Sequence, residues 1–422
     1  MTDPARHAAL ELLTAALGRK AGLEAALDAA PLAALAPQDR AFARALAMAT
    51  LRHLGPIDLA LDRCLQRAPP EPVRMILRLG ATQLFHLGTP AYAAVNSSVA
   101  LAETVRGAKG FKPLINAVLR RLGRDGPPET GPADFAPAWL FARWRAGYGE
   151  SAALAIAARI AEEPLTDVTP RDPADAAALA DALDAVALPG GSLRREGRGR
   201  IEEWPGFAEG RWWVQDAAAA IPARLLGASP GETALDLCAA PGGKALQLAA
   251  AGAKVTAVDR SAVRLGRLAE SLRRTGLAAE VVAADAEAWP DEHAFDTVLL
   301  DAPCTSSGTF RRNPDVLWTL RPGDIAKLAQ VQARLLDAAA RRVRPGGRLV
   351  YCVCSLETEE GEAQARGFLA RHPDFATLAA RPGEAGAPAA SLTPDGWLRI
   401  LPHHLAGGLD GFFVARFARQ PG

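Results

Sequence analysis

Apolar residues recur at helical spacing through the first part of the chain. From Arg6 to about Leu122 they return every three or four positions, and no convincing alternating strand interrupts them. A representative series is Val73, Ile76, Leu77, Gly80, Leu84 and Leu87. Spacing of this kind is typical of amphipathic helices. The pattern therefore predicts an all-helical domain over residues 1–125.

A stretch dense in proline and glycine follows at residues 126–137, with the sequence G-P-P-E-T-G-P-A-D-F-A-P. Because both residue types disfavour helix and sheet, this stretch is the best candidate for a linker. Residues 138–210 then mix helical and strand patterns. They contain a helical run, a possible short strand and an Ala/Asp-rich helix, at residues 151–162, 165–169 and 173–186. This mixture predicts a small α+β module.

From residue 211 to residue 422, short apolar runs alternate with helical stretches such as Ile325 to Val343. The runs that read as strands are Ala234–Leu237, Val255–Val258, Val281–Ala283, Thr297–Leu300 and Leu349–Val353. Strands separated by helices favour a parallel sheet with helices on both faces. We therefore expect a doubly wound α/β domain over residues 211–422.

One strand-to-helix turn has the composition of a ligand cradle. The stretch T-A-L-D-L-C-A-A-P-G-G-K-A-L-Q-L, from Thr233 to Leu248, passes from strand to helix through small residues. Gly242 and Gly243 let the backbone approach a ligand closely, and the helix N-terminus offers free N–H groups. The spacing matches neither the dinucleotide fingerprint nor the nucleoside triphosphate loop.

Two acids end the strands that follow this turn. Asp259 lies roughly 20 residues on, where a carboxylate can accept hydrogen bonds from both ribose hydroxyls. Asp285 ends the next strand, where it could accept from an adenine amino group. Together with the turn, the two acids indicate a cofactor that contains a nucleoside. The ordinary alternative is a tight turn followed by strand-end or N-cap aspartates.

An acid and a thiol follow a buried strand in the stretch L-L-D-A-P-C-T-S-S-G-T-F. Asp301 and Cys304 are therefore expected at the carboxyl edge of the sheet, where open α/β sheets bind ligands. Cys354 ends the next predicted strand, so two thiols and an acid can converge on one crevice. Lys244, at the mouth of the glycine turn, could supply the positive charge that lowers the pKa of a thiol.

The other cysteines, Cys64, Cys238 and Cys352, are more typical of inert packing residues. The C-x-C spacing of Cys352 and Cys354 is not the spacing usual in structural zinc sites, and no His cluster supports one, so we expect no metal. The five cysteines form no evenly spaced framework. Reduced thiols, no membrane-spanning apolar run and no signal-peptide layout together indicate a cytoplasmic protein. The net charge of +1 gives no overall attraction to nucleic acid.

Four motifs together resemble the RNA (cytosine-5) methyltransferases that use S-adenosylmethionine. They are L-D-L-C-A-A-P-G-G-K, D-A-P-C-T-S-S-G, R-R-N-P-D-V-L-W and Y-C-V-C-S-L-E-T-E-E. The resemblance continues through Trp212–Ala220 and Asp410–Phe417, so it covers essentially all of Arg211 to Phe417. The N-terminal part, with L-R-L-G-A-T-Q-L and P-L-I-N-A-V-L-R-R, resembles the helical RNA-binding domain of the antitermination factor NusB. This layout is similar to that of bacterial 16S rRNA methyltransferases and implies a Rossmann-like catalytic domain.

The resemblance implies roles for the residues that match the family's motifs. Cys354 matches the nucleophile that adds to carbon 6 of cytosine, after which carbon 5 can attack the donor's methyl group. Cys304 matches the cysteine that helps to break down the covalent adduct, and Asp301 matches the acid that meets N3 of the base. The residues implied to hold S-adenosylmethionine are Cys238, Ala239, Ala240, Pro241, Gly242, Gly243, Lys244, Asp259, Asp285 and Asp301. Access to both faces of the base requires it to be unpaired or flipped out of a helix.

The sequence departs from the family's pattern in two places. Val353 precedes the nucleophile where the family commonly has Thr, so a hydroxyl contact is absent or replaced there. Gly361 follows the glutamate pair Glu359–Glu360 where the family commonly has Asn. Either departure could alter the packing behind Cys354.

The segment Arg106 to Arg124 carries six positive charges and no acid. Clusters of this kind bind phosphates, and they do so in a salt-sensitive way. The alternative is an ordinary solvated helix face. Arg311 and Arg312, just past the catalytic loop, are further candidates for RNA contacts.

Three functions remain open at the level of sequence. The first is an rRNA cytosine-5 methyltransferase, and the second is a tRNA cytosine-5 methyltransferase, against which the NusB-like domain argues. The third is an RNA-binding or antitermination factor without catalytic activity, which the joint presence of Cys304, Cys354, Asp301 and the donor loop disfavours. Nothing in the sequence requires more than a monomer.

Overall fold

The structure is a computed structural model of the 422-residue chain and describes residues 3–18, 22–27, 30–197, 199–290 and 293–422. It divides into two compact units. The helical unit comprises residues 1–162 and 310–320, and the sheet unit comprises residues 163–309 and 321–422. The domain boundaries predicted from the sequence are not decided by this division and stay predictions.

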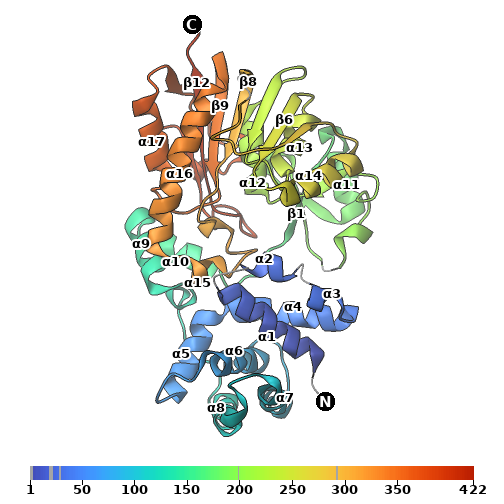
Figure 1. Cartoon of the computed structure of the whole chain (residues 1–422), viewed down its shortest axis with the longest axis vertical. Coiled ribbons are helices and arrows are strands. Elements are labelled where there is room, and N and C mark those ends of the chain that lie inside the picture. The colour runs from blue at the N-terminus through green and yellow to red at the C-terminus, as the bar shows by residue number, and fades with distance from the viewer. Residues whose placement is uncertain (1–2, 19–21, 28–29, 198, 291–292) are drawn as a thin grey trace. The chain divides into compact units, whose positions relative to one another are not determined.

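The helical unit confirms the helical character predicted for the N-terminal part (Figure 1). Its helices are α1 (Pro4–Leu17), α2 (Gly22–Leu27), α3 (Ala30–Ala33), α4 (Pro37–Arg52), α5 (Leu54–Cys64), α6 (Glu71–Phe85), α7 (Ala91–Thr104), α8 (Lys112–Asp125), α9 (Ala138–Tyr148), α10 (Glu150–Ala158) and α15 (Val316–Thr319), with 3-10 turns η1 (Lys109–Phe111) and η2 (Pro132–Phe135). The apolar stripe of α6 is buried, as its spacing predicts. Gly80 allows the close approach of α8, since a Cβ there would lie 2.6 Å from Leu119 Cδ1.

A short segment from the second half of the chain belongs to the helical unit. Residues 310–320 begin directly after the Asp301–Thr309 loop and include α15. Within the unit, Arg52 Nη1 donates to the Arg311 carbonyl oxygen at 2.6 Å, and the Leu23 amide donates to Asp315 Oδ2 at 3.3 Å. Contacts inside the helical unit therefore hold residues 310–320 in place.

The sheet unit contains a small antiparallel sheet in the order β2-β3-β1-β4. Its elements are β1 (Thr166–Pro170), η3 (Pro173–Asp175), α11 (Ala176–Leu183), β2 (Ala185–Ala187), η4 (Pro189–Gly191), β3 (Leu193–Arg195), η5 (Ile201–Glu203) and β4 (Trp212–Val214). The helix predicted at 173–186 is shorter than expected, because Asp184 adopts a left-handed conformation with φ of 49° and ends it. Asp167 and Arg194 form a buried, two-pronged ion pair across this sheet.

The larger sheet has the order β10-β12-β9-β8-β5-β6-β7, and β11 pairs with β12. Its strands are β5 (Thr233–Leu237), β6 (Lys254–Asp259), β7 (Glu280–Ala283), β8 (Phe295–Asp301), β9 (Val343–Val353), β10 (Phe375–Thr377), β11 (Leu398–Ile400) and β12 (Phe412–Arg419). The first five are parallel and correspond to the five predicted strands. The last three are antiparallel, which the sequence patterns did not predict, so the sheet is mixed.

Helices cover both faces of this sheet, as a doubly wound fold requires (Figure 1). They are α12 (Ala217–Leu226), α13 (Gly243–Ala250), α14 (Ala262–Thr275), α16 (Pro322–Arg341) and α17 (Glu362–Arg371), with 3-10 turns η6 (Ser307–Thr309), η7 (Glu384–Gly386) and η8 (Ala389–Ser391). Along β8, Val298 and Leu300 share a core with α16, whereas Leu299 shares a core with α12. This alternation follows from the two-residue repeat of a strand.

The order of the parallel strands indicates where a ligand would bind. From β5 the chain adds β6 and β7 on one side, and then crosses to add β8 and β9 on the other. Ligands of open α/β sheets bind at the carboxyl ends of the strands where the order reverses. That edge carries the glycine turn after β5, Asp259 at the end of β6 and both predicted thiols. Among the described residues, no helix combines the length and apolar character that crossing a bilayer requires.

Candidate active site

Cys304 and Cys354 come together at the carboxyl edge of two neighbouring parallel strands. Asp301 at the end of β8 pairs in register with Cys352 near the end of β9, so the loops that follow lie side by side. The two sulfur atoms are 3.5 Å apart. Ser306 Oγ lies 3.7 Å from Cys354 Sγ, and the Gly308 amide donates to the Cys354 carbonyl oxygen at 3.0 Å. Both thiols are half-buried.

The contact between the thiols shifts their pKa values in opposite directions. A hydrogen bond from Cys304 is the largest influence on the pKa of Cys354. Together with Ser306 and Lys244 it lowers that pKa against the opposing effects of burial and of Asp301. The same hydrogen bond, together with burial, raises the pKa of Cys304 well above its ordinary value. Cys354 is thus the sulfur more easily ionised, and Cys304 is the thiol that donates to it. A thiolate is the nucleophilic form of cysteine.

Asp301 lies between a cation and a third thiol. Its Oδ2 accepts from Lys244 Nζ at 2.7 Å, and its Oδ1 accepts from Cys352 Sγ at 3.3 Å. Burial is the largest single influence on the pKa of Lys244 and would lower it, but the interactions with Asp301, Cys352 and Cys354 together raise that pKa. Lys244 also helps to lower the pKa of Cys354, although less than Cys304 does. The positive charge expected at this position is therefore present, mainly as the partner of Asp301.

Two cysteines expected to be packing residues lie beside this site. Cys352 is fully buried, and burial and Asp301 raise its pKa well above the ordinary value. Burial, Asp301 and Asp259 raise the pKa of Cys238 to about 12. Both side chains thus stay protonated at neutral pH and are poor nucleophiles. Among the described residues, no group of three His, Cys, Asp or Glu side chains is arranged to hold a metal ion.

The glycine turn after β5 forms a tight cradle that leads into α13. Gly242 has a φ of +115°, and a Cβ there would lie 2.4 Å from Leu268 Cδ1, so only glycine fits. Asp259 Oδ2 accepts from the Ala240 amide at 3.1 Å, while Oδ1 accepts from the Ser261 amide at 2.8 Å. The buried Asp259 carboxylate is thereby fixed against the turn. Each of its oxygens retains a second lone pair for a ligand hydroxyl.

Asp285 follows the end of β7 and is exposed. Its Oδ1 accepts from the Glu287 amide at 3.0 Å. The Ala284 amide donates to the main-chain oxygen of Asp259 at 3.1 Å, which ties the end of β7 to that of β6. The structure therefore brings Lys244 into contact with Asp301 and Cys304 into contact with Cys354, and it joins Asp259 to the glycine turn. The roles predicted for these residues stay predictions.

Asp236 is a buried acid that sequence reasoning missed. It is fully buried in β5, and among the described residues neither of its carboxyl oxygens has a hydrogen-bond partner. Burial, followed by the nearby Asp301, raises its pKa well above the ordinary value. The signal was an aspartate in the middle of the apolar strand T-A-L-D-L.

The two departures from the family's pattern have structural accounts. Val353 is fully buried in the core beneath the β9 end, where a methyl group replaces the hydroxyl. At Gly361 a Cβ would lie 2.3 Å from Arg399 Nη2 and 2.8 Å from the ring of Phe413. Arg399 fills this space and donates through Nη1 to the Ser355 carbonyl oxygen. A side chain larger than that of Gly361 would therefore clash with Arg399 where it now lies.

The basic residues predicted to contact RNA differ in how exposed their side chains are. Five of the six basic side chains in the Arg106–Arg124 segment are exposed, and Lys112 is paired with Glu103. Arg312 is exposed, whereas Arg311 is only 1% exposed. The expectation that Arg311 contacts RNA is wrong for the structure as it stands, because a side chain this buried cannot reach a phosphate.

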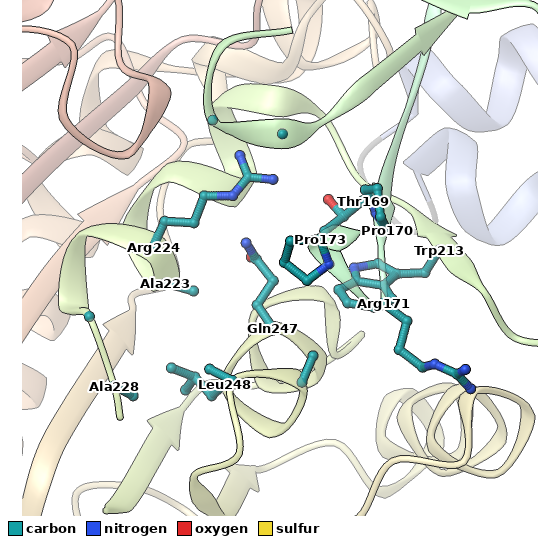
Figure 2. Close-up of a pocket in the computed structure, with 15 residues that line it drawn as sticks. Thr169, Pro170, Arg171, Pro173, Trp213, Ala223, Arg224, Ala228, Gln247 and Leu248 are labelled. Atoms are coloured by element: carbon teal, nitrogen blue, oxygen red, sulfur yellow. The ribbon is translucent and has the colours of Figure 1, made fainter. Parts of the chain in front are cut away.

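A separate cavity of about 300 Å³ lies in the sheet unit (Figure 2). Side chains of β1, α12 and α13 line it, among them Thr169, Arg224 and Gln247. Burial lowers the pKa of Arg224 to about 10. None of the predicted site residues lines this cavity, so it is distinct from the edge that carries the thiols.

Two protein families match two separate parts of the chain. The family described as 16S rRNA methyltransferase RsmB/F matches residues 223–418, and the NusB family matches residues 3–124. The ribosomal RNA small subunit methyltransferase B of Sodalis glossinidius is 37% identical, covering 92% of each chain. Among solved structures, the protein PH0851 matches with a TM-score of 0.80 and 25% identity over 99% of each chain. A methyltransferase homologue from Pyrococcus horikoshii matches with a TM-score of 0.56 and 26% identity, over 66% of this chain and 94% of its own.

Proposed function

The chain belongs to the family of 16S rRNA methyltransferases RsmB/F, and on this premise we propose that it methylates carbon 5 of a cytosine in small-subunit rRNA through a covalent bond to Cys354. It is an RNA methyltransferase that uses S-adenosylmethionine. The observation that carries the proposal is the pair of thiols 3.5 Å apart, with the pKa of Cys354 lowered by its neighbour.

The glycine turn, Asp259 at the end of β6 and Asp285 after β7 fit the donor. The turn can approach the methionine end, and Asp259, held by the Ala240 and Ser261 amides, can accept from the ribose hydroxyls. Asp285 is assigned to the adenine amino group. S-adenosylmethionine supplies the electrophilic methyl group. Lys244, directly after the turn, is paired with Asp301 at the end of β8, and we assign the meeting of the base and the methyl group to this place.

Addition at carbon 6 is the step that the chain's own residues make possible. Carbon 5 of cytosine is a poor nucleophile until another group adds to carbon 6. The Cys354 thiolate forms that bond, and the electron density displaced from the double bond moves onto N3. Asp301 stabilises it there in its protonated form, in which the carboxyl group donates a hydrogen bond to N3. Carbon 5 then takes the methyl group. Loss of its proton and departure of the Cys354 sulfur restore the aromatic ring and free the thiolate.

Cys304 is suited to the release step because its acidity depends on Cys354. The hydrogen bond to Cys354 is the largest influence that raises the pKa of Cys304. Once the Cys354 sulfur is bonded to carbon, it carries no charge to hold that proton. Cys304 then becomes easier to ionise and can accept the proton from carbon 5. This chemistry needs thiols in the reduced form, and the cytoplasm keeps protein thiols reduced, so a cytoplasmic location fits the proposal.

The test compares wild type, Cys304→Ala and Cys354→Ala on small-subunit rRNA with S-adenosylmethionine. A denaturing gel detects the covalent protein–RNA adduct, and methyl transfer is measured in parallel. Cys304→Ala should accumulate the adduct, whereas Cys354→Ala should form none and transfer no methyl group. Adduct formation by Cys354→Ala would contradict the assignment of the nucleophile. Transfer by wild type to tRNA but not to rRNA would contradict the substrate.

A further inference from the structure

Glu360 is a buried glutamate that accepts hydrogen bonds from both thiol loops, the loop after β8 that carries Cys304 and the loop after β9 that carries Cys354. Its exposed fraction is 0%. The residue after Cys304 is Thr305, whose amide donates to Glu360 Oε1 at 3.0 Å and whose hydroxyl donates to Oε2. The residue after Cys354 is Ser355, whose hydroxyl also donates to Oε2. One carboxylate thus holds the positions directly next to both sulfur atoms.

Two further elements fix this carboxylate. Gln332, fully buried on α16, donates through Nε2 to Glu360 Oε1 at 2.9 Å and to the Pro303 carbonyl oxygen at 2.9 Å. Tyr351 of β9 donates through its hydroxyl to the Glu360 carbonyl oxygen at 2.6 Å. The chain on both sides of Cys304 is therefore tied to Glu360, directly through Thr305 and by way of Gln332 through Pro303.

The charge of Glu360 is balanced by hydrogen bonds alone. No Lys or Arg among the described residues forms an ion pair with it, while amide and hydroxyl donors converge on its two oxygens. Burying a carboxylate is costly unless it is fully hydrogen-bonded. A network of this kind has a strong preference for one geometry, because displacing either loop removes donors from a buried charge.

We propose that Glu360, supported by Gln332, is a positioning residue that holds the two thiol loops at the separation needed for Cys304 to donate to Cys354. This inference rests on the proposed function and deepens it, since it names what keeps the nucleophile and its assisting thiol in contact. Glu360 acts through Thr305 and Ser355 and does not touch the base.

The positioning role of Glu360, which we call the clamp, can be tested on the free protein without RNA. Iodoacetamide alkylates thiolates, so the pH dependence of Cys354 alkylation, mapped by peptide mass spectrometry, reports its acidity. Asp301, Lys244 and Ser306 also act on Cys354, and none of them is changed in the variants. Because this readout needs no substrate, it stands or falls independently of the adduct assay above.

Glu360→Gln is the main variant, because it keeps the size of the side chain but places an amide N–H₂ where donors converge. The clamp predicts that the loops separate and that the alkylation midpoint of Cys354 moves to higher pH. The alkylation rate at neutral pH should then fall by about tenfold for every pH unit that the midpoint rises. A purely electrostatic role predicts the opposite sign, since removing a negative charge near the thiols makes them more acidic. The charge of Glu360 is among the influences that raise the pKa of Cys304.

Glu384→Gln is the matched control, since it breaks a partly buried pair with Arg416 in the same unit and touches neither thiol loop. It should lower the thermal midpoint and leave the alkylation profile unchanged. If Glu360→Gln does not fold, Gln332→Met removes two hydrogen bonds at nearly constant volume and should raise the alkylation midpoint in the same direction. An unchanged or lowered alkylation midpoint in a folded Glu360→Gln or Gln332→Met protein would overturn the inference.

Discussion

The Sγ atoms of Cys304 and Cys354 lie 3.5 Å apart although 50 positions separate the residues in the chain. This one contact lowers the pKa of Cys354 and raises that of Cys304. The two sulfur atoms are therefore linked, and Cys354 is the more acidic member of the pair. A change at either position should alter the reactivity of the other.

Cys304→Ala should move the alkylation midpoint of Cys354 to higher pH. The variant removes the hydrogen bond that most lowers this pKa and leaves burial and Asp301, which raise it. Cys304→Ser is the matched control, because its hydroxyl can still donate and should preserve part of the effect. The rate of Cys354 alkylation against pH is the measurement. Identical profiles for wild type and Cys304→Ala would contradict the assignment.

Lys244→Met should lower both stability and methyl transfer. It removes the cation 2.7 Å from Asp301 and leaves a partly buried carboxylate without its partner, which typically costs a few kcal/mol. The uncompensated Asp301 charge also makes Cys354 harder to ionise. Thermal unfolding and initial transfer rates measure the two effects, with a rate loss of at least about tenfold expected.

A double variant separates stability from chemistry in this pair. Lys244→Met with Asp301→Asn removes both charges and should recover much of the stability lost in Lys244→Met alone. Methyl transfer should stay low, because Asp301 is assigned to the base. Recovery of activity together with stability would show that Asp301 has only a structural role.

Local patterns predicted the parallel strands well, because an apolar run bounded by turns marks a buried strand wherever it lies. The stretch Phe412–Arg419 has a similar pattern, yet its place as β12 between β9 and β10 depends on pairing with distant strands. Because the carboxyl ends of parallel strands lie at one edge of the sheet, the sequence predicted that Asp301, Cys304 and Cys354 would lie near one another. It did not predict which atoms touch, because those contacts join loops that are far apart in the sequence.

Other features of the site had no local signal. In the sequence, Glu360 appeared only as part of a motif. Its hydrogen bonds join it to Thr305 after β8, to Ser355 after β9 and to Gln332 on α16, which are distant from one another in the chain. Arg311 read as an exposed basic residue because charge in a sequence does not reveal burial. The position of residues 310–320 in the helical unit likewise depends on contacts with α1–α10 and not on composition.

Gly308→Ala should destabilise the Cys304 loop. A Cβ at this position would lie 2.1 Å from the Gly411 carbonyl oxygen, which is backbone and cannot rotate away. Overpacking of this kind costs about 1–3 kcal/mol, and the Gly308 amide that donates to Cys354 would shift with it. Thermal unfolding and methyl transfer should both decline. Gly323→Ala, where a Cβ meets nothing within 4 Å, is the control and should leave both unchanged or slightly improve stability.

Asp236→Asn should change how stability depends on pH. The raised pKa means that the folded protein keeps Asp236 protonated where the unfolded chain ionises it. The associated stability is complete below the unfolded pKa of about 4 and is lost progressively as pH rises toward the folded value. An amide mimics the protonated acid and cannot ionise. The variant should therefore match wild type near about pH 4 and exceed it increasingly toward about pH 8.

Asp296→Asn provides a control of opposite sign in the same sheet. Hydrogen bonds from the Thr233 hydroxyl and amide, both 2.7 Å long, lower the pKa of Asp296. Its stabilising effect is present above the unfolded pKa and is lost as pH falls, so this variant should lose stability at neutral pH and approach wild type in acid. Thermal midpoints measured against pH for the three proteins test both signs at once. Parallel curves for wild type and Asp236→Asn would mean that Asp236 is ionised in the folded protein.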